Sequence, residues 1–327
     1  MLKKLLFGIA LAGVCLYFAF QGISIRATMD SLRQAQCQWI ALAVVLYGFA
    51  YVMRTWRWKI LMGPVHPVPA SQLFHPLVIG FFANNVLPFR MGELVRAHVT
   101  GRKFGISRTA SLGTILLERL SDMISFLSTF VAAAFFFPFP RNAERGAALM
   151  AAACVALIFG LIVGIKFRSH LHQWIDKLPL PAPWKARLQD ITEDFVQGIS
   201  GVHNLSYVAG AMALSLIIWI NEGTNLFLIA RAFPIHLSYP QAFFLLFFLG
   251  LSVTLPQAPG YVGTMELFGV TALTLLGITK AQALPVILAI HGTQFSFIIV
   301  LGLFSLWREG MSFNKLVEPA KQELAPS

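Results

Sequence analysis

The sequence predicts an all-α polytopic membrane protein with about six spanning helices and two re-entrant hairpins. Two properties of the 327-residue chain lead to this prediction: 57% of its residues are hydrophobic and 12% are charged. Soluble proteins carry about twice that charged fraction, so water cannot be the solvent for most of this chain. A spanning helix needs about 20 apolar residues, and runs of that length recur along the sequence.

Six apolar runs are long enough to cross a bilayer. The first one follows Met1–Lys4 and could begin a signal peptide, but its length of about 19 residues exceeds a typical signal core and no clear cleavage site precedes Ser24. It is therefore predicted to be a retained span. The predicted spans are approximately Leu5–Ile23, Trp39–Leu61, Arg108–Phe137, Gly146–Phe167, Leu205–Phe233 and Ala281–Trp307.

Two further apolar stretches are interrupted by helix breakers near their middles. Gln72–Leu94 contains Pro88, and Tyr239–Gly277 contains Pro256–Gly260. Proline removes a backbone donor and clashes with the preceding turn. Non-helical backbone at membrane depth is tolerated where protein buries it or where it lines a cavity. Both stretches are therefore predicted to be re-entrant hairpins.

The whole chain, 1–327, is predicted to form a single integral membrane domain that ends in a short polar tail, 308–327. Residues 168–204 combine charges and three prolines with apolar side chains at helical spacing, which fits an amphipathic helix on the membrane or an ordinary solvated helix. With the N-terminus inside, eighteen Lys and Arg residues fall on the cytoplasmic side and six on the other. This bias predicts that both termini are cytoplasmic.

Weak internal symmetry relates the two halves of the chain. The first hairpin contains Pro-x-x-x-Gly-Glu starting at Pro88, and the second contains Pro-x-x-x-Gly-x-x-Glu starting at Pro259. Spans with polar residues flank each hairpin at similar distances, and the predicted topology makes the hairpins enter from opposite faces. Because transporters often contain such inverted repeats, residues 39–137 and 205–307 are predicted to be two inverted halves.

Charged residues inside the apolar segments are the candidates for function, because a charge at the bilayer centre costs about 2.5–3.5 kcal/mol on insertion scales. Glu118 and Asp122 share one helix face, and Arg119 points about 100° away from it. Arg119 either fixes packing against a neighbouring helix or lines a path for a charged headgroup. The predicted substrate-binding and translocation residues are Asn85, Pro88, Arg90, Glu93, Arg96, Glu118, Arg119, Asp122, Glu222, Pro259, Gly260, Gly263, Glu266 and His291.

Three of these residues also have simpler explanations. Arg90 and Arg96 fit positive-inside anchors, although Arg90 beside a broken helix also suits an anion such as phosphate, because free backbone N–H groups lie next to a guanidinium. His291 alone is more typical of a packed histidine than of a proton relay. The three cysteines are scattered without metal-ligand spacing, so neither a metal nor another cofactor is predicted.

Several motifs resemble those of a known family. They are Asn84–Arg96, Gly105–Ser107, Leu117–Asp122, the pair Arg57-Trp58 and Leu255–Glu266, in which Tyr261 stands where a second glycine is usual. Together they resemble the lysylphosphatidylglycerol synthase transmembrane-region family, also called flippase-like membrane proteins. The resemblance implies a polytopic protein of the bacterial-type inner membrane. Family members translocate lipids or are linked to polyprenyl or dolichyl phosphate sugars.

The chain is therefore predicted to move a phospholipid or polyprenyl-phosphate-linked lipid between leaflets, through a polar cavity between the halves. No lysyl transfer is expected, because the chain ends soon after Trp307 without an aminoacyl-transferring domain. One alternative is a membrane-embedded enzyme, although no H-x-x-x-H or D-x-D pattern supports it, and another is an accessory subunit of envelope lipid or glycan synthesis. The expected partners are lipids with anionic or phosphate-bearing headgroups, and no nucleic acid.

Overall fold

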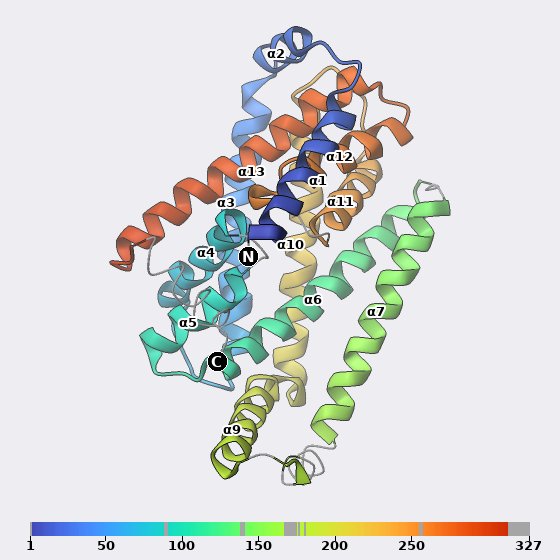
Figure 1. The fold of residues 1–327 in the computed structure, drawn as a ribbon. Helices are drawn as coiled ribbons and strands as arrows, with labels where there is room; N and C mark the ends of the chain where they lie inside the picture. The colour runs from blue at the N-terminus through green and yellow to red at the C-terminus, as the bar shows by residue number, and fades with distance from the viewer. Residues whose placement is uncertain are drawn as a thin grey trace.

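The computed structural model describes residues 2–87, 91–137, 141–166, 175, 177–179, 181–254 and 258–312. These residues are mostly helical and include no strand, which confirms the all-α prediction. Figure 1 shows the arrangement of the helices. They are α1 (Leu2–Phe20), α2 (Ile25–Arg33), α3 (Cys37–Met62), α4 (Ala70–Val86), α5 (Gly92–Phe104), α6 (Arg108–Ala134), α7 (Arg141–Lys166), α9 (Ala182–Gly198), α10 (Leu205–Arg231), α11 (Tyr239–Thr254), α12 (Thr264–Leu275) and α13 (Lys280–Arg308), with the short 3₁₀ helices η2 (Ser200–His203) and η3 (Pro259–Tyr261).

Three helices in the described part of the chain are long and apolar enough to cross a membrane: α3, α10 and α13. They coincide with the second, fifth and sixth predicted spans, and α6 and α7 occupy the third and fourth. The first predicted span ends early, because α1 stops at Phe20. Residues 10–20 and α2 then form a pair bent by 81°, with Gly22 between them at a φ of 79°. A positive φ of this kind is readily adopted by glycine.

Each interrupted apolar stretch consists of two helices that pack against each other. The first broken pair is α4 with α5, and the second broken pair is α11 with α12. Pro88 and Arg90 lie in the first break, outside the described residues. In the second break Pro259 starts η3, and positive φ values occur at Gly260 (72°), Tyr261 (62°) and Gly263 (87°). These positive φ values turn the chain directly before α12 begins at Thr264.

Glycines allow the helices of the first broken pair to approach closely. Gly92, the first residue of α5, faces Gly80 of α4, and a Cβ built on Gly92 would overlap the carbonyl oxygen of Gly80. The Gly92 N–H also donates to Asn84 Oδ1 at 2.8 Å. Small residues at helix interfaces permit such backbone contact in membranes, so this packing leaves no room for a side chain at position 92.

We expect Gly92→Ala to lower the stability of the protein by about 1–3 kcal/mol, the usual cost of overpacking, because a backbone atom has to move. Gly292→Ala in α13 is the matched control, since nothing lies within 4 Å of its built Cβ and alanine favours a helix over glycine by about 1 kcal/mol. Thermal unfolding in detergent compares the two variants. Equal unfolding temperatures would contradict the close packing of α4 on α5.

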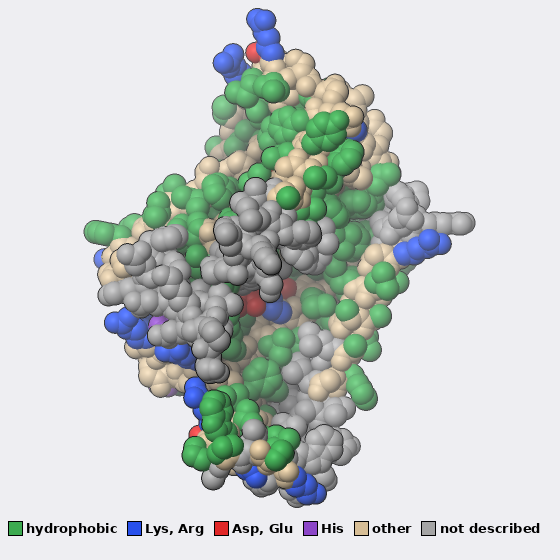
Figure 2. Space-filling model, in the orientation of Figure 1, with side chains coloured by type: hydrophobic (Ala, Val, Ile, Leu, Met, Phe, Trp, Pro, Cys, Tyr) green, Lys and Arg blue, Asp and Glu red, His purple; other side chains and the backbone are tan. Residues whose placement is uncertain are grey.

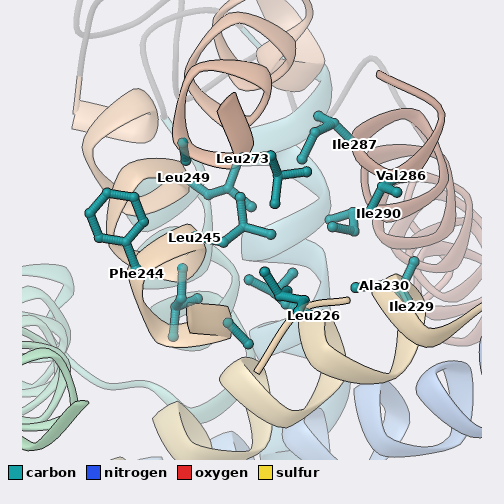
Figure 3. Packing of buried hydrophobic residues seen from close by; sticks show 14 of the residues in the cluster. Leu226, Ile229, Ala230, Phe244, Leu245, Leu249, Leu273, Val286, Ile287 and Ile290 are labelled. Carbon is teal, nitrogen blue, oxygen red and sulfur yellow. The ribbon is translucent and has the colours of Figure 1, made fainter. Parts of the chain in front are cut away.

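Two apolar clusters hold the broken pairs in place. The larger one lies where α10, α11, α12 and α13 meet (Figure 3), and includes the buried side chains of Leu226, Leu245, Leu273 and Ile290. The second cluster joins α3, α4, α5 and the far part of α13. Each broken pair also packs against the opposite half of the chain, because α4 contacts α13 and α11 contacts α6.

The segment predicted to be an amphipathic helix, 168–204, contains α9, which begins at Ala182 after Pro181. It packs against the first part of α6. The backbones of Gly198 and Gly113 touch there, because a Cβ built on Gly113 would lie 2.8 Å from the Cα of Gly198. Ser107 Oγ donates to Asp194 Oδ2 at 2.5 Å. This helix therefore packs against the part of α6 that precedes Glu118, Arg119 and Asp122.

Candidate functional site

Buried charges from α3, α5 and α6 meet around Glu118. Arg96 of α5 donates to both carboxylate oxygens of Glu118, at 3.0 and 2.8 Å. Arg57 Nη2 of α3 lies 3.3 Å from Glu118 Oε1. Glu118 and Arg57 are fully buried and Arg96 is 2% exposed. A two-pronged arginine–carboxylate pair is among the strongest charge-assisted contacts in proteins, so Glu118 ties three helices together.

Asp122 extends this group by one turn of α6. Arg57 donates to Asp122 Oδ1 and, at 3.2 Å, to Oδ2. The Ser215 hydroxyl of α10 accepts from Arg57 Nη1 at 2.8 Å, and the Trp219 indole donates to Asp122 Oδ1 at 3.1 Å. The two α6 carboxylates share a face, and a single guanidinium from α3 bridges them.

The tryptophan next to Arg57 supports the neighbouring arginine. The guanidinium carbon of Arg96 lies 3.6 Å from the centre of the Trp58 ring, a cation–π contact. The Trp58 indole donates to Thr114 Oγ1 of α6 at 3.1 Å. The adjacent residues Arg57 and Trp58 thus support the same group: Arg57 pairs with the carboxylates of Glu118 and Asp122, and Trp58 stacks on Arg96, the other arginine bound to Glu118.

Arg119 lies at the open side of this group. Its Nη2 donates to Glu118 Oε1 at 2.5 Å and lies 3.6 Å from Asp122 Oδ2. Its Nε is 3.7 Å from Glu93 Oε1 of α5. The side chains of Arg119 and Glu93 are 28% and 37% exposed, in contrast to the buried members. Figure 2 shows acidic and basic atoms in a recess near the middle of the molecule.

We call Arg57, Arg96, Arg119, Glu93, Glu118 and Asp122 the charge cluster. Apart from Glu93, it contains two carboxylates, Glu118 and Asp122, and three guanidiniums, of which Arg119 is partly exposed. Glu93 supplies the third carboxylate from the exposed side, 3.7 Å from Arg119 Nε and thus beyond hydrogen-bond distance. The Nε of Arg119 is buried and forms no hydrogen bond with the described residues, so this donor of Arg119 is unused in the present conformation.

A second ion pair joins α3 to α10. Arg54 Nη2 donates to Glu222 Oε1 at 2.5 Å, and both side chains are nearly buried. The guanidinium of Arg54 also lies 5.3 Å from the centre of the Phe81 ring of α4. Beside Glu222 on α10, the side-chain amides of Asn221 and Asn225 donate to backbone carbonyls of α3 at 3.0 and 2.7 Å. Polar side chains of α10 thus fix its contact with α3.

A third polar site lies in the second broken pair. His291 of α13 contacts Glu266 of α12 and the carbonyl of Gly260, and Glu266 also accepts from the Gly263 N–H. This site is separate from the charge cluster. Among the described residues, no group of three His, Cys, Asp or Glu side chains is arranged to hold a metal ion.

The structure places the predicted site residues in three groups. Glu93, Arg96, Glu118, Arg119 and Asp122 belong to the charge cluster, Glu222 pairs with Arg54, and Pro259, Gly260, Gly263, Glu266 and His291 lie at the second break. Asn85 donates its amide to the Phe81 carbonyl within α4 at 2.9 Å.

Sequence reasoning missed Arg54 and Arg57 as site residues. It counted both, together with Arg96, as cytoplasmic topology charges. In the structure all three are nearly or fully buried in ion pairs, and the side of the membrane on which they lie stays a prediction. The available signal was their spacing: Arg54 and Arg57 lie one turn apart within an otherwise apolar helix.

The helical fold and the buried charges define an integral membrane protein. Over residues 5–302 the chain matches the family described as lysylphosphatidylglycerol synthase TM region, and it belongs to that family.

Three curated relatives match most of the chain. The chain is 24% identical over 290 residues to a UPF0104 membrane protein of Methanothermobacter thermautotrophicus, which covers 85% of both chains. A second protein of that name from the same organism is 22% identical, over 88% of this chain and 90% of the relative. UPF0104 membrane protein MJ1078 of Methanocaldococcus jannaschii is 21% identical, over 74% of this chain and 99% of its own. No solved structure matches the chain at a comparable level of significance.

Proposed function

We propose that this protein is a flippase-like transporter that moves a lipid with a phosphate-bearing headgroup between leaflets, without changing it covalently. The observation that carries the proposal is the position of Arg119. It lies eleven residues into α6, about 16 Å along the helix, and is partly exposed. A charge at this depth of a bilayer about 30 Å thick is costly. A role in binding a polar headgroup explains why the protein keeps an arginine at this position.

The phosphate-bearing class of headgroup follows from the charges. Apart from Glu93, the charge cluster has three guanidiniums and two carboxylates, and Glu93 balances this excess from 3.7 Å. A phosphate that displaced Glu93 would supply a closer anion to Arg119, and guanidinium groups match phosphate oxygens in geometry. Arg57, Arg96, Glu118 and Asp122 would then serve as the rigid base that orients Arg119.

An apolar groove on α6, the helix that carries Glu118, Arg119 and Asp122, suits acyl or polyprenyl chains. It lies between α6 and α7 and has a volume of about 660 Å³. Its lining begins at Ile124, shortly after Asp122 on α6, and includes Leu127, Val131 and Phe135. A lipid bound with its headgroup at Arg119 could lay its tails along this groove.

Two inverted halves would supply alternating access to the headgroup. The helix contacts support this arrangement: α3 packs on α10, and each broken pair contacts the last helix of its own half and that of the other half. In each half a buried contact between titratable side chains joins the broken pair to the last helix of the same half, Arg96 to Glu118 in one half and Glu266 to His291 in the other. The broken pairs would be re-entrant hairpins that act as the gates.

The depths of these two pairs also agree with an inverted arrangement. Glu118 lies ten residues after the start of α6, and His291 lies eleven residues after the start of α13. Both distances correspond to about 15–16 Å of helix. With six spans, α6 starts at the cytoplasmic face and α13 starts at the opposite face. The two pairs would then lie at matching depths from opposite sides.

The proposed location is a bacterial-type cytoplasmic membrane, with both termini inside. Setting aside the buried Arg54, Arg57 and Arg96, fifteen positive residues remain on the cytoplasmic side against six outside. This asymmetry still satisfies the positive-inside rule. Proteins of envelope lipid or glycan synthesis are the proposed partners in the cell.

Reconstitution into vesicles tests the proposed function. The full chain is incorporated into liposomes that carry fluorescent phosphatidylglycerol or a fluorescent polyprenyl phosphate, and a membrane-impermeant quencher reports how fast the lipid changes leaflet. We expect faster exchange than in protein-free vesicles of the same composition for one or both lipids. Exchange no faster than in protein-free vesicles, across a panel of phosphate-bearing lipids, would overturn the proposal.

A further inference from the structure

The second break contains a buried histidine with hydrogen-bond partners on both ring nitrogens. His291 Nδ1 lies 2.5 Å from Glu266 Oε1, and His291 Nε2 lies 2.6 Å from the carbonyl oxygen of Gly260. The other carboxylate oxygen of Glu266 accepts from the Gly263 N–H at 2.7 Å. His291 and Glu266, here called the dyad, are 8% and 3% exposed. Both ends of the dyad are therefore tied to the backbone of the break.

The partners determine how many protons the dyad holds. A carbonyl oxygen can only accept, so Nε2 carries a hydrogen and donates it to Gly260. An unprotonated Nδ1 and a carboxylate oxygen are both acceptors and would repel each other at 2.5 Å, so a second proton lies between them. The dyad thus holds one proton more than a neutral imidazole beside a carboxylate would hold.

Few other titratable groups lie around this proton. Cys15 of α1 is buried and interacts electrostatically with Glu266, and Tyr261 is the residue after Gly260 in η3. The helices that pack on α13 carry further charged or titratable side chains, among them Asp30 on α2, Arg54 on α3, His75 on α4 and Glu222 on α10.

We propose that the dyad is a proton-binding site that couples lipid movement to protons, an inference that rests on the transport function proposed above. In the conformation described, the shared proton holds the second break closed. When that proton leaves to water, the imidazole keeps its hydrogen on Nε2, and the Nδ1 lone pair faces the Glu266 carboxylate. Repulsion then separates the two groups, so His291 releases Gly260 or Glu266 releases Gly263.

Movement of the second break reaches the first broken pair. A Cβ built on Gly260 would lie 3.8 Å from the carbonyl oxygen of Asn85 and 3.0 Å from the Phe295 ring. Asn85 belongs to the last turn of α4, directly before the first break, and η3 packs against α4. The first broken pair carries Glu93 and Arg96 of the charge cluster. The protonation state of the dyad is thereby connected to the headgroup site.

The substitution Glu266→Gln tests the role of the shared proton without removing the hydrogen bonds of residue 266. The amide can donate to His291 Nδ1 and accept from the Gly263 N–H, so both contacts remain while the titratable carboxyl is gone. In vesicles we expect wild-type leaflet exchange of fluorescent phosphatidylglycerol to change at least about fivefold with pH, a typical size for coupling between two sites, and Glu266→Gln to lose this dependence. His75→Gln is the control, because His75 also bonds α13, through the Ser305 hydroxyl at 3.1 Å.

The pH profiles distinguish the two proposals. The same pH dependence in Glu266→Gln and wild type would overturn the proton site and leave transport standing, and so would wild-type exchange that does not vary with pH. Exchange that is absent in the wild type at every pH would overturn the transport function instead.

Magnetic resonance of ¹⁵N-histidine-labelled protein tests the proton without any transport. Among the eight histidines, we expect one with protons on both ring nitrogens and a strongly hydrogen-bonded proton at Nδ1. That signal should vanish in His291→Gln, and its Nδ1 proton should be lost in Glu266→Gln. A His291 whose Nδ1 is unprotonated beside Glu266 would overturn the inference, whatever the vesicles show.

Discussion

Replacing Glu118 by glutamine is expected to lower the free energy of unfolding by about 3–5 kcal/mol, the usual cost of breaking a buried ion pair by removing one partner. Glu118 contacts Arg96 twice, Arg57 at 3.3 Å and Arg119 at 2.5 Å. The substitution keeps the volume and one acceptor oxygen, but it leaves Asp122 as the single buried carboxylate beside the three guanidiniums.

The matched control for this substitution is Asp30→Asn. Asp30 pairs with Arg33 at 3.6 Å on the surface of α2, where both side chains are more than half exposed. Exposed pairs of this kind contribute about 0–1 kcal/mol. Thermal unfolding in detergent, followed by size-exclusion chromatography, compares both variants with the wild type. If Glu118→Gln is as stable as Asp30→Asn, then the charge cluster does not hold α3, α5 and α6 together.

Replacing Arg119 by glutamine is expected to slow leaflet exchange of a phosphate-bearing lipid at least about tenfold, which corresponds to about 1.4 kcal/mol. The protein should remain folded, because Glu118 keeps Arg96 and Arg57 as partners and Arg119 is partly exposed. The exchange rate of Arg119→Lys should lie between those of the wild type and Arg119→Gln, since lysine keeps the charge but lacks the planar guanidinium that matches phosphate oxygens.

Arg231→Gln provides the control for Arg119. Arg231 ends α10 and lies over the rings of Trp39 and Phe227, at 4.8 and 5.7 Å, away from the charge cluster. Its substitution should leave exchange within about twofold of the wild type, as surface changes distant from a site usually have small effects. If Arg119→Gln and Arg231→Gln exchange lipid at the same rate, Arg119 is not part of the headgroup path.

The apolar pattern of the sequence predicted the helices well because each span depends on local composition. The bounds of α3, α10 and α13 lie within a few residues of the predicted ones. The shared face of Glu118 and Asp122 was predictable for a similar reason, since helical periodicity places residues four apart on one side. Both features require knowledge of one helix alone.

The partners of the charged residues could not be predicted in this way. Arg57 and Asp122 are 65 residues apart, and Arg54 and Glu222 are 168 apart. Such pairs depend on the orientation and axial position of each helix relative to its neighbours. The glycine contacts and aromatic stacking that determine this packing are spread over several helices. The repeat pattern matched Glu266 with Glu93, but the close hydrogen-bonded contact to the last helix is made by Glu266 in one half and by Arg96 in the other, while Glu93 lies 3.7 Å from Arg119. Similar motifs thus did not reveal which residues pair.

The central claim is that the charge cluster selects a phosphate-bearing headgroup for passage across the bilayer. The most direct test compares wild-type leaflet exchange of two fluorescent lipids with identical tails, phosphatidylglycerol and an uncharged diglycosyl diacylglycerol, in the same vesicles. We predict that the protein accelerates exchange of the phosphate-bearing lipid and leaves the glycolipid at the rate of protein-free vesicles. Equal acceleration of both lipids, or acceleration of neither, would contradict the claim.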